Sequence, residues 1–526
     1  MAVLSTELGA FQPFNLLVAL TAAYIFYSII TRLYTSHLRK QLAAKLGCQP
    51  AFNSTPGILA AIKNSYECLL VFKEIRYNEW MEAKFTSTGL KTVQQTVFGH
   101  VSISTCDAEN IKHVLSTRFE DFALGRRNDH MVPLLGHGIF STDGEVWKYS
   151  RSVVRPHFSK KDIEDFRSIE RHFRNLVKHI DARPGLVVDN FQSLFYKMTL
   201  DSSTEFLTGT SSNTLAQLPV DGVETKNIFM EAFDKAQELI VYSMATDLES
   251  IIFKLPAWKR ARDDVFKFVD EKIQQALAEN PEGLEKRADA KPREFTILHH
   301  LISDTRDPVF LRDQILSLML AGRDTTACLL SFATYELARH PELYAKLRRE
   351  IITQLGSDES RFTFSSLKDC SYLQYVLNET LRLYPPVPDN MRYAVEDTYI
   401  PRGGGPDQMS PVFLQKGQPV NYNVYAMQRD PRIWGPNAAK FIPERWEKGH
   451  PEYRKTGAWE YLPFNGGPRI CIGQQYALAN GGYVLARLCQ LYERMDTLDP
   501  ERKDPLMNSS LVMSLYNPAP IKLVRA

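Results

Sequence analysis

The stretch of this sequence with the clearest chemistry is FNGGPRICIG, residues 464–473, which places one cysteine among glycine, proline and arginine. A helical pattern follows directly, so Cys471 lies where the N–H groups of a helix start carry partial positive charge. That position lowers the pKa of a thiol and favours the thiolate, the form that binds metals or acts as a nucleophile. Gly466 and Gly467 let the backbone approach a flat object, and Arg469 supplies a cation for an anion alongside.

A thiolate, a flat object and an anion together indicate haem, which has an iron that accepts an axial thiolate and two propionates. The alternative is a buried structural cysteine in a tight loop, and for a lone cysteine that alternative is the better one. The combined spacing of Phe464, Gly467, Arg469, Cys471 and Gly473 favours haem. We therefore predict that Cys471 is the axial ligand of a haem iron.

A second motif, AGRDTT at residues 321–326, lies in the middle of a long, mostly apolar helical pattern that covers 310–340. Asp324 and Thr325 put an acid beside a hydroxyl, and such a pair can relay the protons that the cleavage of dioxygen needs. The two small residues before them leave a groove for a diatomic molecule. Alternatively, the small residues mark a close helix crossing, with Asp324 paired to Arg323.

Two further motifs pair charged or aromatic side chains on one helix face. Glu379 and Arg382 of ETLR are three residues apart and can form an ion pair; their surroundings are apolar, so the pair is predicted to be buried and to need a further partner. Arg445 of FIPERW is the candidate. In WKYSR, Trp147 and Arg151 are four residues apart and can face one anion, although an ordinary amphipathic surface gives the same pattern.

The loop FNGGPRICIG carries every position of the pattern F-x-x-G-x-R-x-C-x-G and so resembles the haem-binding loop of the cytochrome P450 superfamily. The resemblance implies haem b as the cofactor and Cys471 as the thiolate ligand on the proximal side of the iron. It implies roles for the other motifs as well. Asp324 and Thr325 would be catalytic, Glu379, Arg382 and Arg445 a structural triad behind the loop, and Trp147, Arg151 and, more loosely, Arg392 contacts to the haem propionates.

Within the superfamily the resemblance is to the fungal alkane and fatty-acid omega-hydroxylases, through stretches such as GHGIFSTDGEVWKYSRSVVRPHF and PRGGGPDQMSP. It implies NADPH- and O2-dependent hydroxylation of an n-alkane or fatty acid at or near its terminal carbon. Ala479–Asn480 departs from the Thr–Glu pair expected there. A tailoring hydroxylase of a fungal secondary metabolite is therefore the alternative, with an isomerase that uses no oxygen and a non-catalytic haem protein as remote ones.

The N-terminus predicts a membrane anchor. Residues 14–30 carry no charge, and the apolar stretch extends to about residue 34, just long enough to cross a bilayer. A cleaved signal peptide is the alternative, but Lys and Arg appear only after the segment, as in an uncleaved signal anchor. The positive-inside rule then places the rest of the chain in the cytosol. We expect a single-pass protein of the endoplasmic reticulum membrane.

Composition argues against several other classes of protein. The 526 residues carry a net charge of +2 without a long basic block, which argues against nucleic acid as a partner. Seven scattered cysteines with no CxxC pair argue against a disulfide framework or a structural zinc site. No flavin or nicotinamide module is recognisable, so electrons must come from a separate NADPH–cytochrome P450 reductase, with cytochrome b5 as a second candidate donor.

The expected architecture is mostly α with a small β-rich part, the cytochrome P450 fold, as a single large domain behind the anchor. Its parts are an anchor helix at 1–34, a basic juxtamembrane segment and hinge at 35–57, with the hinge itself at 53–57, and a catalytic domain at 58–526. Helices are predicted at 310–340 and 366–384, short strands at 388–424 and a surface loop at 279–294. The substrate pocket is expected along 126–138, 318–325, 387–391 and 514–517, where Arg126 or Arg127 either holds a carboxylate or belongs to an ordinary surface pair.

Overall fold

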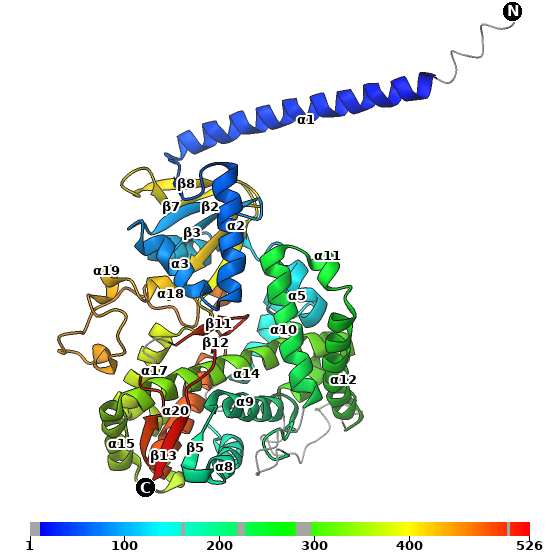
Figure 1. Cartoon of the computed structure of the whole chain (residues 1–526). Coiled ribbons are helices and arrows are strands. Elements are labelled where there is room, and N and C mark those ends of the chain that lie inside the picture. Colours follow the sequence, from blue (N-terminus) through cyan, green and yellow to red (C-terminus); the bar gives the residue numbers. More distant parts are fainter. Residues whose placement is uncertain (1–10, 159–163, 218–226, 280–295, 502–504) are drawn as a thin grey trace, which may run out of the picture.

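The computed structural model describes residues 11–158, 164–217, 227–279, 296–501 and 505–526. Figure 1 shows one helix, α1 (Phe11–Lys45), standing clear of a body whose β-rich part lies at the α1 end and whose remainder is mainly helical. The predicted fold class, mostly α with a small β-rich part behind an N-terminal helix, is confirmed. The predicted loop at 279–294 lies, beyond Glu279, outside the described residues.

Among the described residues, two helices are long and apolar enough to cross a membrane, and they differ in burial. The apolar window of α1 is not buried in the body at all, whereas that of α14 (Pro308–Arg339) is 83% buried and therefore belongs to the core. The end of α1 is tied to the body, because Arg39 Nε donates a hydrogen bond to Asp397 Oδ2 at 2.9 Å. The hinge expected at 53–57 stays a prediction. Two of its residues are bonded to the sheet, since Asn53 lies in strand β1 and Ser54 N–H donates to Gln94 O.

The helices between α1 and α14 are α2 (Gly57–Lys73), α3 (Tyr77–Thr86), α4 (Ala108–Lys112), α5 (Arg127–Leu135), α6 (Gly144–Val154), α8 (Arg167–Asp181), α9 (Phe191–Thr208), α10 (Ile228–Thr246), α11 (Glu249–Ile252), α12 (Pro256–Glu279) and α13 (Ile297–Asp304). After α14 come α15 (Pro341–Leu355), α16 (Phe364–Asp369), α17 (Ser371–Leu383), α18 (Val424–Met427), α19 (Pro431–Trp434) and α20 (Gln474–Leu491).

The strands form four small sheets among the described residues. The largest has the order β1-β2-β3-β9-β6-β4 and mixes parallel with antiparallel pairs, while β10-β13-β5, β11-β12 and β7-β8 are antiparallel. Their bounds are β1 (Phe52–Asn53), β2 (Thr92–Val97), β3 (His100–Thr105), β4 (Phe122–Ala123), β5 (Val187–Val188), β6 (Asp389–Ala394), β7 (Thr398–Gly404), β8 (Ser410–Leu414), β9 (Pro419–Asn423), β10 (Tyr492–Thr497), β11 (Met507–Ser509), β12 (Met513–Leu515) and β13 (Ile521–Arg525). The predicted strand-rich stretch at 388–424 corresponds to β6–β9.

Helix α14 runs through the body and joins two parts of the core. Asp307 caps its first turn by accepting from Val309 N–H, and Pro341 starts the next helix, so both ends are set by local sequence. Buried residues at 311–320 pack with α10, α12 and α13, whereas those at 327–338 pack with α15, α17 and α20. The motif at 321–326 therefore lies at the boundary between these two hydrophobic core clusters.

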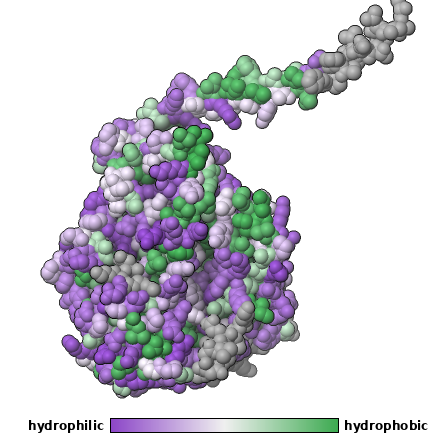
Figure 2. Space-filling model, viewed as in Figure 1, coloured by the Kyte–Doolittle hydropathy of each residue, from purple (hydrophilic) through white to green (hydrophobic). Residues whose placement is uncertain are grey.

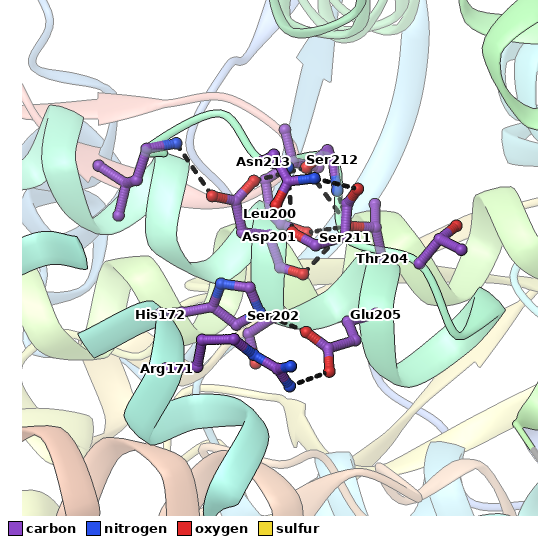
Figure 3. Close-up of polar contacts among 12 residues, drawn as sticks. Arg171, His172, Leu200, Asp201, Ser202, Thr204, Glu205, Ser211, Ser212 and Asn213 are labelled. Atoms are coloured by element: carbon purple, nitrogen blue, oxygen red, sulfur yellow. Dashed lines mark hydrogen bonds and ion pairs between the residues drawn. The ribbon is translucent and has the colours of Figure 1, made fainter. Parts of the chain in front are cut away.

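Helix α9 supports α14 from the side and is itself held by polar contacts (Figure 3). Asp201 accepts hydrogen bonds from Ser212 Oγ at 2.7 Å and Leu215 N–H at 2.9 Å, which fixes the segment after α9. His172 of α8 bonds Glu205 at 2.7 Å on the next turn. These contacts hold α9 where a Cβ added to Gly322 of α14 would lie 2.8 Å from Ser203 Oγ.

Candidate haem-binding site

Cys471 lies at the end of a loop that leads into α20. Its N–H donates to Phe464 O at 2.9 Å, which closes the loop, and the N–H of Gly473 points at the thiol. All seven cysteines are described, and Cys471 alone has an exposed side chain. Burial is nevertheless the main influence on its pKa, so the thiol faces open space that the surrounding protein encloses.

The sequence predicts a lowered pKa for the Cys471 thiol, and this prediction is wrong, because the pKa is raised in the structure. Burial raises the thiol pKa, and the Gly473 N–H and the Arg151 guanidinium lower it by less. The helix start thus acts in the predicted direction, but desolvation outweighs it. A thiolate at this position requires a further positive partner, and a bound metal ion supplies one.

The loop glycines make room for protein groups close by. Gly467 has a φ of 68°, and an added Cβ would meet Leu115 O at 1.8 Å, so only glycine fits. At Gly466 an added Cβ would meet the Trp459 ring at 2.6 Å. The flat neighbour inferred for these two glycines is, in this structure, an indole and a peptide group. A Cβ at Gly473 would make only ordinary contacts, so crowding does not explain this glycine.

Three arginines from distant segments gather beside the cysteine loop. Arg469 belongs to the loop, Arg392 to β6 and Arg127 to the start of α5. Burial and the neighbouring Arg392 lower the pKa of both Arg127 and Arg469 to about 10. The acid at this cluster is Asp143, whose Oδ1 lies 2.7 Å from Arg469 Nη2. Arg392 is buried, Arg127 and Arg469 are half-buried, and three such cations beside one carboxylate favour binding of further anions.

Trp147 and Arg151 lie on α6 as predicted, next to this cluster. The Arg469 guanidinium lies 4.4 Å from the centre of the buried Trp147 ring, and that of Arg151 lies 5.9 Å from it. Arg151 and Cys471 also influence each other electrostatically, since the thiol raises the pKa of Arg151 and the guanidinium lowers that of the thiol. Helix α6 thus links the anion-binding side of the site to the cysteine.

The sequence left the arginines at 126 and 127 as one undecided pair, and the structure separates them. Arg126 is exposed and bonds Asp247 at 2.7 Å on the surface. Arg127 is directed inward, where its Nη1 donates to Asn390 Oδ1 at 2.9 Å. Sequence reasoning also missed Asp143, although an acid directly before the WKYSR helix was a signal available in the sequence.

Asp324 and Thr325 are neighbours in sequence but face different surroundings. Thr325 and Ala321 are half-buried, and Thr325 Oγ1 donates to Ala321 O at 2.5 Å. This bond leaves the lone pairs of the hydroxyl free to accept a hydrogen bond. Asp324 is buried on the α10 side of α14, where Gln237 donates to it. Gly322 packs against α9, so the small-residue motif serves a helix crossing as well.

Asp324 can hold and release a proton near neutral pH. Burial raises its pKa to about 6, against the opposing effect of Arg323, whose Nη1 lies 3.2 Å from Asp324 Oδ1. Arg323 also bonds the half-exposed Asp234 of α10 at 2.6 Å. The carboxyl of Asp324 is therefore connected through charged groups to the surface.

A cleft of about 900 Å³ reaches Asp324 from outside. Residues of α2, α9, α10 and the β11–β12 hairpin line it, with Arg323 and Asp324 among them. Of the segments predicted to form the substrate pocket, 318–325 and 514–517 contribute to this cleft, and 126–138 and 387–391 do not.

Glu379, Arg382 and Arg445 form the predicted triad, and all three side chains are buried. Glu379 Oε1 lies 2.8 Å from Arg382 Nη2 and 3.3 Å from Arg445 Nε. Their remaining donors bond backbone carbonyls between residues 428 and 440. The triad therefore fixes the chain that leads into the cysteine loop.

The described residues fit a haem group. The Cys471 thiol faces enclosed open space, as an axial ligand must, and the arginine cluster with Trp147 and Arg151 matches two propionates. A thiolate donor, cations for two carboxylates and an acid–hydroxyl pair on a central helix define a haem-thiolate protein.

The comparison with known proteins agrees with this haem-thiolate site. Residues 83–524 match the family described as Cytochrome P450, and the chain belongs to this family. Haem b is therefore its cofactor, dioxygen its co-substrate, and electrons come from NAD(P)H through a reductase; the chain is a haem-thiolate monooxygenase.

Similar proteins match the chain from end to end. Cytochrome P450 52A10 of Candida maltosa is 43% identical over 515 residues, which cover 94% of this chain and 96% of the relative. Cytochrome P450 52A9 of the same yeast is 41% identical over 96% of this chain and 97% of its own length. Cytochrome P450 52A12 of Debaryomyces hansenii is 43% identical over 88% and 90%.

Proposed function

We propose that the protein hydroxylates a long aliphatic chain, an n-alkane or a fatty acid, at or near its terminal carbon. The proposal rests on the resemblance to the fungal alkane and fatty-acid hydroxylases, which covers nearly the whole chain after the anchor. One structural observation carries it furthest: the cleft that reaches α14 opens between α2 and α10, and both helices carry exposed apolar side chains.

Those apolar surfaces favour a substrate that arrives from a membrane. Ile58, Leu59 and Ile62 of α2 are among the most exposed large apolar side chains of the body. Tyr242 of α10, which lines the cleft, and Ile251 of α11 are exposed as well. Figure 2 shows apolar surface over α2 and over the α10–α11 end of the body on one face. With α1 in the bilayer, an enzyme arranged in this way meets lipid substrates at high local concentration.

We propose the endoplasmic reticulum membrane as the location, with the body in the cytosol, because the first basic residues follow the apolar segment of α1.

The electron donor proposed is NADPH–cytochrome P450 reductase, with cytochrome b5 as a second donor. The bounds proposed for the functional parts are 1–34 for the anchor, 35–57 for the connection and 58–526 for the catalytic domain.

The proposed roles of the site residues follow from their surroundings. Bound haem supplies the activation of dioxygen and the insertion of one oxygen atom into a C–H bond. The Cys471 thiolate would hold the iron and donate electron density to it, and Arg127, Arg392 and Arg469 would neutralise the propionates. Asp324 takes up protons from the cleft and releases them on the opposite side of α14. Thr325 accepts a hydrogen bond through its free lone pairs.

A panel of substrates tests the proposed function. Membranes that carry the full chain and a fungal reductase are incubated with NADPH and with n-alkanes and free fatty acids, and hydroxyl positions are mapped by mass spectrometry. Terminal or near-terminal products are expected, and membranes with the reductase alone give the background. An intact haem-thiolate spectrum without any aliphatic product would overturn the substrate class and leave the tailoring of a specialised metabolite.

Replacing Thr325 with alanine should separate NADPH consumption from product formation. The variant loses the one hydroxyl that faces open space on α14, and product should fall by roughly 10²-fold, as for the loss of a positioned proton-transfer group. NADPH consumption should continue, with hydrogen peroxide as the measurable by-product.

Thr326→Ala is the matched control for Thr325→Ala, because the Thr326 hydroxyl is buried and finds no hydrogen-bond partner among the described residues. Coupling should be unchanged in this control. Equal coupling in Thr325→Ala and in the unmodified enzyme would exclude the proposed role of Thr325.

A further inference from the structure

A second cluster of metal-ligating side chains lies away from the cysteine loop. His130 of α5, Asp247 at the end of α10 and Glu249 of α11 each place one ligand atom within 4.8 Å of the others. None of the three belongs to the haem site described above. Asp247 adopts a left-handed backbone with a φ of 58°, which Asp tolerates, and this turn brings two carboxylates toward α5.

The orientation of His130 leaves one ring nitrogen directed at the carboxylates. Nδ1 bonds Ser243 Oγ at 3.1 Å, and Nε2 lies 3.5 Å from Asp247 Oδ1. The ring is buried. A hydrogen bond that fixes the ring through one nitrogen and leaves the other free is the usual arrangement around a metal-binding histidine.

Each carboxylate divides its oxygens between an existing partner and the space beside His130. Asp247 Oδ2 lies 2.7 Å from both His100 Nε2 and Arg126 Nη1, so Oδ1 remains for His130. Glu249 Oε1 lies 3.7 Å from Arg126 Nη2. Its second oxygen, Oε2, is buried and finds no hydrogen-bond partner among the described residues. An unpaired buried carboxylate oxygen is costly and indicates a missing cation or donor.

We propose that His130 Nε2, Asp247 Oδ1 and Glu249 Oε2 bind a Zn²⁺ ion. One imidazole and two carboxylates are a donor set that Zn²⁺ accepts, with a fourth position left for water. His100 and Arg126 then hold the outer oxygens of the carboxylates. The half-exposed side chain of Arg126 marks the solvent side, from which the ion enters.

Zinc at this point would connect two segments that otherwise meet through ion pairs. The ion joins α5 to the turn between α10 and α11. Helix α5 begins with Arg127, a member of the arginine cluster, so an ion bound one turn later restrains the segment that carries that residue. The inference does not depend on which substrate the enzyme hydroxylates.

The competing explanation is an ion-pair cluster in which Arg126 alone neutralises both carboxylates. Arg126 bonds Asp247 Oδ2 well, but its separation of 3.7 Å from Glu249 Oε1 is too long for a hydrogen bond. Glu249 Oε2 accepts no hydrogen bond from it. The two explanations predict opposite effects of removing Arg126. Without this competing cation, a zinc site binds more tightly, whereas a simple ion-pair cluster gains no affinity for metal.

Zinc binding to the purified, haem-loaded full chain in detergent tests the proposal. The protein is treated with EDTA, freed of it, and titrated with Zn²⁺ against a chromophoric chelator, with bound metal counted by mass spectrometry. One ion per chain is expected. Glu249→Gln and His130→Gln should abolish this site, Ser243→Ala should weaken it by about tenfold or more, and Arg126→Gln should strengthen it.

Glu238→Gln, which removes an exposed acid of α10 that pairs with Lys235, is the matched control and should bind zinc as the unmodified chain does. The haem absorption spectrum of each variant verifies the fold. Equal zinc affinity in the unmodified chain and in Glu249→Gln would overturn the proposal, as would absence of binding at micromolar Zn²⁺. Glu249→Gln keeps the test decisive if His130→Gln, which alters a buried side chain, fails to fold.

Discussion

Replacing Cys471 with serine is expected to abolish the absorption band of a thiolate-ligated haem in the reduced, CO-bound state. Activity should fall to that of membranes without the chain. The physical reason is local: Cys471 alone among the seven cysteines faces open space, so no other thiol can take its place. A serine hydroxyl has a far higher pKa than a thiol and donates little electron density to iron.

The control for Cys471→Ser is Cys48→Ser, which changes a half-buried cysteine in the connection after α1. Its spectrum and activity should match those of the unmodified enzyme. The arginine cluster remains in Cys471→Ser, so the variant should still retain some haem, now with a spectrum typical of a non-thiolate ligand. A thiolate band that persists in Cys471→Ser would rule out Cys471 as the ligand.

Local sequence was sufficient for some elements of the fold. The bounds predicted for α14 were right to within two residues, because Pro308 and Pro341 mark both ends of one apolar pattern. The helix predicted at 366–384 proved to be two, α16 and α17, with Cys370 extended between them. Nothing in the local sequence signals this break, since Glu350 of α15 caps α17 by accepting from Tyr372 and Leu373 N–H, a tertiary contact.

In the candidate site, too, features encoded by local sequence could be predicted, and features that depend on tertiary contacts could not. The spacing of the cysteine loop and the pairing of Glu379 with Arg382 are local, and both could be predicted from sequence. Arg469 and, through the resemblance, Arg392 were also named from the sequence as contacts to an anion. Arg127 could not be assigned to the same cluster, because it comes from a third, distant segment. The net pKa shift of Cys471 was also beyond sequence reasoning, since it depends on how much protein surrounds the thiol.

Replacing Glu379 with glutamine is expected to remove a large part of the stability of the catalytic domain. Glu379 accepts hydrogen bonds from Arg382, Arg445, Ile442 N–H and Trp446 Nε1, and its side chain is fully buried. The variant leaves the buried Arg382 guanidinium without its counter-charge, and Arg445 keeps only Glu452, whose Oε2 lies 3.6 Å from Arg445 Nη1. Breaking such a buried pair costs about 3–5 kcal/mol, a large part of the roughly 5–15 kcal/mol by which a domain is stable.

The yield of haem-loaded Glu379→Gln and its thermal unfolding measure this effect, and activity per haem distinguishes structure from catalysis. The triad bonds carbonyls between residues 428 and 440 and makes no contact with Cys471 or Asp324, so any folded fraction should turn over at the normal rate per haem. Glu447→Gln, which changes an exposed acid next to the triad, should leave yield and unfolding unchanged. A stable Glu379→Gln with low activity per haem would give the triad a role in the reaction, whereas a stable and active one would mean that Arg382 and Arg445 are neutralised by other groups.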